Sequence, residues 1–392
     1  MIEIKTITKK SEIADFIDFR TDLYRDDPYA VPYLFMDEMA DLDKKKNIAF
    51  QYCEAEYYMA YRDGKPVGRV AAMINHKANT LWNQKNVRFG YFDFIDDFDV
   101  SEALIKKVEE YGRAKGMDTI IGPMGFIDLG REGLLVEGFE QLQTMHANHN
   151  FPYYQDHIEA LGFAKDNDWL QYLVTVPDQV PEKFEKISAM IGKRYNLEAR
   201  KMTKKEAIDG GLGQRLFDIL NESYKDLYQF SPIDQQQVNK MVKDYLGIAD
   251  MNLITLICDK NKDTGGLQGA IDSMVGFGVT FPSFSKALQH TNKGRLMPFG
   301  WWPMLKTIKT GRFHYTDTVD LLLIAVLPEY RAKGANAILF NDLIRWYQKY
   351  EFKQALTLAM MESNDGVLSA WQYLESKTAT RLRSYKKKIK TL

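Results

Sequence analysis

The sequence predicts an α+β fold in two domains. The chain has 392 residues, more than one ordinary hydrophobic core accommodates, which favours two domains. A polar passage with two prolines, residues 176–186, separates two apolar-rich regions. We therefore expect domains at residues 1–178 and 179–392. Each contains a predicted hairpin and then strand, helix and strand, so the two domains share one order of parts.

The first domain opens its series with a hairpin over residues 56–75, because alternating apolar runs flank the turn dipeptide Asp63-Gly64. A strand, a helix and a strand follow, over residues 88–94, 102–115 and 119–122. Four acidic residues lie around the turn from strand to helix: Asp93, Asp96, Asp97 and Asp99. Carboxylates suit a helix N-terminus but repel a phosphate. We expect no phosphate-bearing cofactor in this domain.

The second domain shows the same order. A hairpin is predicted within residues 252–281, with its turn at residues 263–266. A strand, a helix and a strand follow, over residues 320–326, 335–350 and 354–361.

The turn between strand 320–326 and helix 335–350 has the composition of a phosphate site. Gly334 lets the backbone fold tightly, so that turn amides and the positive end of the helix dipole converge. Arg331 and Lys333 add cationic side chains. A capped helix after a strand is the plainer interpretation. The chain lacks G-x-x-x-x-G-K-S/T and G-x-G-x-x-G, which excludes a P-loop NTPase and a dinucleotide fold.

The turn Arg331-Ala332-Lys333-Gly334-Ala335-Asn336 resembles the Q/R-x-x-G-x-G/A pyrophosphate loop of the GNAT acyl-CoA N-acyltransferases, with Asn336 in place of the usual Gly or Ala. Longer segments resemble the YghO-like acyltransferases, bacterial proteins with two GNAT domains: DLYRDDPYAVPYL, KPVGRVAAMIN, IIGPMGF, LLVEGFEQ, NFPYYQDHIEALGFAKDNDW, GRLMPFGWWPML and LRSYKKK. The resemblance implies two tandem GNAT-like domains, each a mixed, mostly antiparallel twisted sheet flanked by helices. It further implies acetyl-CoA or another acyl-CoA as cosubstrate, no metal, and acyl transfer to an amine of an unidentified acceptor.

The resemblance also implies which residues form the site in the second domain. The strand before the loop would splay from its neighbour and pair with the pantetheine arm of CoA. The implied cofactor-binding residues are Ile324, Ala325, Val326, Arg331, Lys333, Gly334, Ala335, Asn336 and Asn364.

Four residues are candidate catalysts, because amine acylation needs a base for the amine proton and an acid for the thiolate. Asp320 matches the position of a base carboxylate in several GNAT enzymes; a strand-start Asp facing water is the alternative. Glu362 either relays a proton or caps a following helix. Tyr373, with Asn364, resembles the N…Y element of the family, and Tyr385 is the rival acid.

Residues 283–318 form an insertion rich in large apolar side chains. We expect the wall of an acceptor or acyl groove. Two alternatives stay open: a lid packed on the domain core or against the other half, and a face that touches a membrane.

Composition limits the partners and the compartment. The net charge is −1 from 52 basic and 53 acidic residues, so no nucleic-acid partner is expected. Cys53 and Cys258 have no metal spacing, the N-terminus has no apolar leader, and no stable membrane insertion is expected, which together favours the cytoplasm. Two other functions stay open: a FemABX-type aminoacyl-tRNA-dependent transferase, and a non-catalytic acyl-CoA-binding protein.

Overall fold

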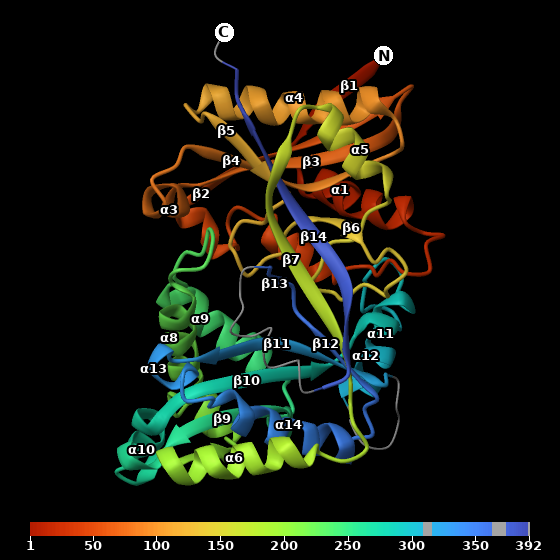
Figure 1. Cartoon of the computed structure of the whole chain (residues 1–392). Helices are drawn as coiled ribbons and strands as arrows, with labels where there is room; N and C mark the ends of the chain where they lie inside the picture. The colour runs from red at the N-terminus through yellow and green to blue at the C-terminus, as the bar shows by residue number, and fades with distance from the viewer. Residues whose placement is uncertain (309–315, 363–373, 391–392) are drawn as a thin grey trace. The chain divides into compact units, whose positions relative to one another are not determined.

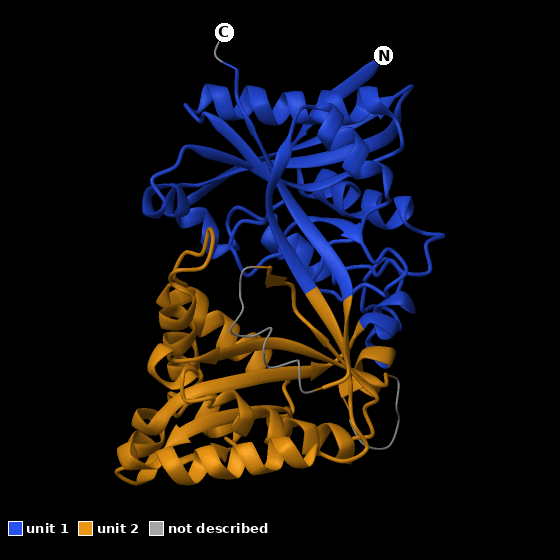
Figure 2. Cartoon of the chain, in the orientation of Figure 1, with its two compact units in different colours: residues 1–170, 285–302, 379–392 blue, residues 171–284, 303–378 orange. Residues whose placement is uncertain are grey.

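The computed structural model describes residues 1–308, 316–362 and 374–390 (Figure 1). The chain divides into two compact units (Figure 2). Unit 1 comprises Met1–Leu170, Ser285–Trp302 and Ala379–Leu392, and unit 2 comprises Gln171–Phe284 and Pro303–Thr378. These units do not coincide with the predicted ranges 1–178 and 179–392. The difference arises because strand pairing with distant parts of the chain, which no local pattern encodes, decides where strands 164–175 and 376–388 belong.

Unit 1 contains one sheet, in the order β1-β2-β3-β4-β5-β14-β7. Its strands are β1 (Ile2–Ile7), β2 (Cys53–Arg62), β3 (Lys65–Asn75), β4 (Asn86–Phe94), β5 (Thr119–Gly122), β6 (Leu134–Glu137), and the unit 1 parts of β7 (Ala164–Thr175) and β14 (Ser376–Lys388). The pairs β1–β2, β2–β3 and β3–β4 are antiparallel, whereas β4 and β5 are parallel. The sheet is therefore mixed and mostly antiparallel, as expected.

Local turn chemistry explains the first hairpin. Asp63 and Gly64 have φ of +51° and +76°, which Gly and Asp tolerate and which suit a two-residue turn between twisted strands. Strand β4, the last of the four strands β1 to β4 that pair antiparallel in succession, is irregular. Its register with β3 shifts between Arg69 and Ala71, and Tyr91 has φ of +48°. Its parallel pairing with β5 runs only from Asn86 to Arg88.

The helices of unit 1 are α1 (Lys10–Leu23), α2 (Phe35–Asp41), α3 (His76–Leu81), α4 (Phe98–Ala114), α5 (Tyr153–Ala160) and α11 (Ser285–Gln289). Of these, α1 and α4 pack against the sheet in two separate cores. The alternation along β2 separates two cores. Tyr58 and Ala60 pack with α4 residues such as Leu104 in one core, whereas Tyr57 and Met59 pack with α1 residues such as Phe16 in the other.

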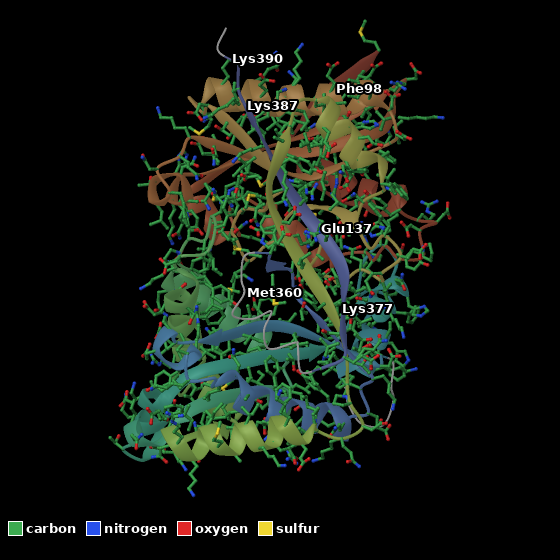
Figure 3. All side chains as sticks on the ribbon, in the orientation of Figure 1. Phe98, Glu137, Met360, Lys377, Lys387 and Lys390 are labelled. Carbon is green, nitrogen blue, oxygen red and sulfur yellow. The ribbon has the colours of Figure 1, made fainter. Side chains whose placement is uncertain are left out.

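Unit 2 repeats this arrangement with the sheet order β7-β12-β11-β10-β9-β8. Its further strands are β8 (Leu197–Arg200), β9 (Ile254–Asp259), β10 (Met274–Pro282), β11 (Thr318–Val326), β12 (Gln354–Thr357) and β13 (Met360–Met361). β8, β9, β10 and β11 pair antiparallel in succession, and β11 and β12 are parallel. Met360, labelled in Figure 3, marks β13, which pairs with β7.

The helices of unit 2 are α6 (Glu182–Tyr195), α7 (Lys204–Ile208), α8 (Leu212–Tyr224), α9 (Gln235–Met241), α10 (Gly266–Ser273), α13 (Pro328–Arg331) and α14 (Asn336–Lys349). α12 (Trp301–Ile308) crosses the boundary between the units. The predicted turn at residues 263–266 is wrong in detail: β9 and β10 pair as expected, but α10 stands between them. The predicted strand over residues 354–361 is two short strands, β12 and β13.

Candidate active site

The bulged strand β11 defines the candidate site in unit 2. Opposite β10, Val279 pairs with Leu323 and Thr280 with Leu321, so Leu322 is an extra residue in β11. On its other side β11 pairs with β12 only from Thr318 to Leu321. Among the described residues, β12 has no pairing with β11 beyond this point. The strands therefore part at the bulge, as expected for a strand that receives a ligand along its edge.

Helix α8 holds the parted end of β11 by two hydrogen bonds. The Tyr224 hydroxyl donates to the carbonyl of Ile324 (3.0 Å) and the Ser223 hydroxyl to that of Val326 (3.2 Å). Burial raises the pKa of Tyr224 to about 12, so its hydroxyl stays protonated as a donor. Because a carbonyl oxygen has two lone pairs, a pantetheine arm that paired at Ile324 would share this oxygen with Tyr224 or displace it. Ala325, between them, is buried.

The turn after β11 is more structured than expected, because α13 fills its first half. Gly334 follows with φ of +75°, the left-handed conformation that Gly adopts without strain. The amides of Lys333 and Gly334 donate to the carbonyls of Tyr330 (3.2 Å) and Arg331 (3.0 Å), and that of Ala335 donates to Tyr330 (3.4 Å). Of these turn bonds only that of Ala335 is long, and all three would have to break for the same amides to reach a phosphate.

The two cations of the turn have different roles. The Arg331 guanidinium donates to the carbonyls of Val326 (2.8 Å) and Ser223 (2.6 Å), so it ties the turn to β11 and α8. The Lys333 ammonium lies 4.2 Å from the Tyr330 ring centroid. At the start of α14, Asn336 has a buried amide oxygen without a hydrogen-bond partner among the described residues. Lys333 and the α14 dipole are therefore the groups that a pyrophosphate could engage, whereas Oδ1 of Asn336 is an acceptor and cannot donate to a phosphate oxygen.

Replacing Arg331 with Ala is expected to lower the free energy of unfolding by about 2–3 kcal/mol, because two buried carbonyls lose a charge-assisted donor. Chemical denaturation monitored by circular dichroism measures this. Lys333→Ala is the matched control, with little expected loss of stability. An Arg331→Ala protein as stable as the parent would contradict the structural role of Arg331.

Asp320 lies on β11 within the stretch paired with β12 and is 4% exposed. The alternative of a strand-start Asp facing water is therefore wrong, because the side chain is buried and its Oδ1 is sealed from solvent. Its Oδ1 has no hydrogen-bond partner among the described residues. Burial raises the pKa of Asp320 to about 7, against the opposing effect of a hydrogen bond from Ser283. Such a carboxyl exchanges protons near neutral pH, which a general base requires.

The other candidate catalysts lie elsewhere or outside the described residues. Glu362 directly follows β13 and is exposed. Asn364 and Tyr373 fall outside the residues that the structure describes. Tyr385 belongs to unit 1, where β14 pairs with β5 and the Tyr385 hydroxyl lies 3.4 Å from Glu159 Oε1. Burial raises the pKa of Tyr385 to about 12.

In unit 1 the corresponding position is the N-terminus of α4, where acidic side chains of the protein itself lie. Asp97 caps α4 by accepting from the amide of Asp99, and it forms an ion pair with Arg62. The Arg62 hydrogen bond lowers the pKa of Asp97. Asp96 lies 3.1 Å from the His157 ring. These acids repel a phosphate from α4, which supports the expectation that unit 1 has no CoA pyrophosphate site.

The aromatic insertion is divided between the units: residues 285–302 belong to unit 1, and residues 283–284 and 303–318 belong to unit 2. Arg295 forms a two-bond ion pair with Asp18 (2.7 and 2.9 Å), and the carbonyl of Gly294 accepts from the Phe35 amide (3.0 Å). Long-range contacts of this kind cannot be read from the insertion itself. Its exposed large apolar residues are Met297, Phe299, Trp301, Trp302 and Leu305.

Comparison with solved structures identifies the fold. Across its full length the chain superposes on the whole of a tandem GNAT protein from the clavulanic acid biosynthesis pathway, with a TM-score of 0.55 and 11% identity. The chain has the tandem GNAT fold. A GCN5-related N-acetyltransferase from Sphaerobacter thermophilus matches all of the chain and 96% of its own length, with a TM-score of 0.51 and 12% identity. The predicted fold class and the resemblance to GNAT proteins are confirmed.

Two curated proteins resemble the chain in sequence. Protein YghO of Escherichia coli (strain K12) is 27% identical over 396 residues, which cover 98% of this chain and 95% of YghO. A bacterial ceramide synthase of Caulobacter vibrioides is 26% identical over 321 residues, covering 79% of this chain and 76% of that protein. The resemblance to YghO is thus confirmed over nearly the whole GNAT-fold chain. No protein-family model matches it.

The described residues contain no helix that is both long enough and apolar enough to cross a membrane. In the same part of the chain, no three His, Cys, Asp or Glu side chains gather as metal ligands. His149 and His157 pair with carboxylates instead, His149 with Asp27 at 2.8 Å and His157 with Asp96 at 3.1 Å.

The groups that the sequence analysis missed are Ser223, Tyr224 and Ser283. Ser223 and Tyr224 lie about a hundred positions before the strand that they hold. Their sequence carries no local signal, since a Ser-Tyr pair at a helix end is ordinary.

Proposed function

We propose that unit 2 transfers an acyl group from acyl-CoA to an amine. The observation that carries this proposal is the bulged strand β11, which parts from β12 beside a buried carboxyl, Asp320. A thioester laid along the parted edge would bring its carbonyl close to that carboxyl. The GNAT fold and the similarity to a ceramide synthase support the same reaction class.

The proposed reaction uses Asp320 as the base. The amine nitrogen attacks the thioester carbonyl and forms the C–N bond, while its proton moves to the Asp320 carboxylate directly or through one water. The tetrahedral intermediate then collapses, the C–S bond breaks, and the CoA thiolate takes a proton from solvent or from an acid. With a pKa of about 7, Asp320 is partly ionised at neutral pH and can accept the proton.

The acceptor that we favour is a lipid amine. The relative from Caulobacter vibrioides is a ceramide synthase by name, and a ceramide is the amide of a long-chain amino alcohol. The sequence similarity covers 79% of this chain, which includes residues from both units. The exposed apolar residues of the insertion offer a surface of matching chemistry.

Acetyl-CoA and longer acyl-CoA are expected to raise the thermal stability of the full chain. Ligand at a hundredfold excess over its dissociation constant stabilises the native state by about 2.7 kcal/mol. Differential scanning fluorimetry with acetyl-, octanoyl- and palmitoyl-CoA measures this, with equal concentrations of the free fatty acids as controls.

Turnover separates this proposal from its rivals. Release of CoA thiol that depends on a long-chain amine supports the transferase. Stabilisation by acyl-CoA without turnover over a broad amine panel would favour a binding protein. No stabilisation by any acyl-CoA would exclude both, and would leave aminoacyl-tRNA-dependent transfer to be assayed.

A further inference from the structure

The segment of residues 297–305 presents only apolar side chains to solvent. Its exposed residues are Met297, Pro298, Phe299, Trp301, Trp302 and Leu305. Met297 is 71% exposed and Phe299 is 78% exposed. α12 begins within this segment, and its exposed residues, Trp301, Trp302 and Leu305, are all apolar, which reverses the usual pattern of a helix on a protein surface. A contiguous apolar patch of this kind marks an interaction surface.

Contacts of the fold hold this segment in place. Just before it, the Arg295 guanidinium pairs with both carboxylate oxygens of Asp18 (2.7 and 2.9 Å). Gly300 has no room for a side chain, since a Cβ there would lie 2.1 Å from the Arg295 carbonyl oxygen. The rings of Trp301 and Trp302 contact each other edge to face, with centroids 5.7 Å apart. The aromatic side chains are therefore displayed by a built structure and not by a loose loop.

The hydrogen-bond donors at the start of α12 are already paired. The start of a helix normally leaves free N–H groups, which are costly in an apolar phase. Here the amides of Trp301 and Trp302 donate to carbonyls just before the helix (2.9 and 3.2 Å). Pro303 has no N–H, and the Trp301 indole donates to the Pro298 carbonyl (3.1 Å). This part of the segment can therefore enter lipid without leaving these donors unpaired.

The chain around the patch is basic. From Ser273 to Ile308 the sequence has four basic residues and no acidic one, although the whole chain has 52 basic and 53 acidic residues. Two of the four, Lys293 and Arg295, pair with carboxylates of α1, whereas Lys306 lies on α12 next to the exposed Leu305. Positive charge beside an apolar patch complements an anionic surface. It disfavours a second copy of the same patch, which would bring like charges together.

We infer that the segment of residues 297–305 docks the protein on the surface of an anionic membrane, with Phe299, Trp301 and Trp302 in the interfacial layer. Aromatic side chains favour this layer, where their apolar rings meet the acyl chains. The segment lies on the bilayer and does not span it. The inference goes beyond the proposed function, because vesicle binding needs neither acyl-CoA nor turnover.

The test is co-sedimentation of the full chain with vesicles of phosphatidylcholine and phosphatidylglycerol, and with vesicles of phosphatidylcholine alone. Binding is expected to the anionic vesicles, and more weakly to the neutral ones. Phe299→Ser removes an exposed aromatic ring and is expected to weaken binding to the anionic vesicles roughly tenfold or more. Leu81→Ser is the matched control, since Leu81 is 55% exposed on α3, and it should bind like the parent. Circular dichroism checks that each variant is folded.

Quenching of tryptophan fluorescence by brominated phosphatidylcholine tests the position of the rings directly. The chain has six tryptophans. Changing two of them together, Trp301→Phe and Trp302→Phe, keeps the patch apolar, so this protein should still bind the vesicles but lose most of the quenching. If Phe299→Ser fails to fold, this difference in quenching decides.

Three results would overturn the inference: no binding to anionic vesicles, a folded Phe299→Ser protein that binds them like the parent, or equal quenching with and without Trp301 and Trp302. A dimer that Phe299→Ser dissociates, found in place of vesicle binding, would overturn it as well and assign the patch to a second copy of the chain.

Discussion

Replacing Asp320 with Asn is expected to lower kcat by about 10²–10⁴-fold, with little change in KM for acyl-CoA. Asn keeps the size of the side chain and its hydrogen bonding but cannot accept the proton of the amine. The parent should lose kcat as pH falls below about 7, because the pKa of Asp320 lies there. Steady-state rates across pH 5–9 measure both effects.

The same substitution is expected to stabilise the protein above pH 7. Burial raises the pKa of Asp320 from 3.8 to about 7, so the native state holds a proton there that the unfolded chain has lost. The stability of the parent therefore falls as pH rises from about 4 to 7, and the loss is complete above pH 7. The Asp320→Asn side chain cannot ionise and avoids this loss, so the advantage of this variant at pH 8 is expected to be on the order of 2–4 kcal/mol.

Asp317→Asn is the matched control for both measurements, since Asp317 is an exposed carboxylate just before the same strand. It should change neither kcat nor the pH dependence of unfolding. An Asp320→Asn enzyme with the parent kcat and pH profile would remove Asp320 from the mechanism. Glu362, or the free form of the amine itself, would then account for proton removal.

Gly334→Val is expected to weaken acyl-CoA binding roughly tenfold or more, a loss on the order of 1.5–3 kcal/mol. With φ of +75°, a β-branched residue forces the turn to change its backbone angles. A Cβ at this position would also lie 3.0 Å from Ile191 Cδ1 of α6. The amides at the start of α14 then lose their alignment with a bound pyrophosphate. Isothermal titration with acetyl-CoA measures the change.

The backbone strain itself costs about 1–3 kcal/mol of stability, so binding must be separated from destabilisation. Gly116→Val is the matched control: Gly116 also has φ of +75°, a Cβ added to it would meet open space, and it lies after α4 of unit 1. It should lose stability but keep the affinity for acetyl-CoA. If Gly334→Val and Gly116→Val bind acetyl-CoA equally well, the turn serves only as the start of α14.

Local features were predictable because the residues that cause them are neighbours in the chain. Asp63-Gly64 dictates its hairpin through its own backbone angles, and the apolar spacing of α14 predicts a helix within one residue at each end. α10 was missed because the glycines at its start, Gly265 and Gly266, are also typical of an open turn.

The site was less predictable because its chemistry depends on distant partners. The sequence around Asp320 is equally compatible with a surface position, and the burial of its side chain is set by tertiary packing, which no local pattern encodes. Arg331 has the expected place in the turn, but its guanidinium is bound by the carbonyl of Ser223, 108 positions away. No periodicity encodes such a pair.

Unit 1 is built from the first residues of the chain and from some of its last residues, so it cannot be completed early in synthesis. Residues 379–388 form the strand of unit 1 that pairs with β5, although more than two hundred residues of chain separate them from that partner. During translation, the edge of β5 that pairs with β14 therefore stays unpaired until residues 379–388 have been synthesised. An uncovered strand edge of this kind invites mispairing with other nascent chains. Chaperone dependence and sensitivity to premature termination should consequently be greater for the half of the protein that is made first.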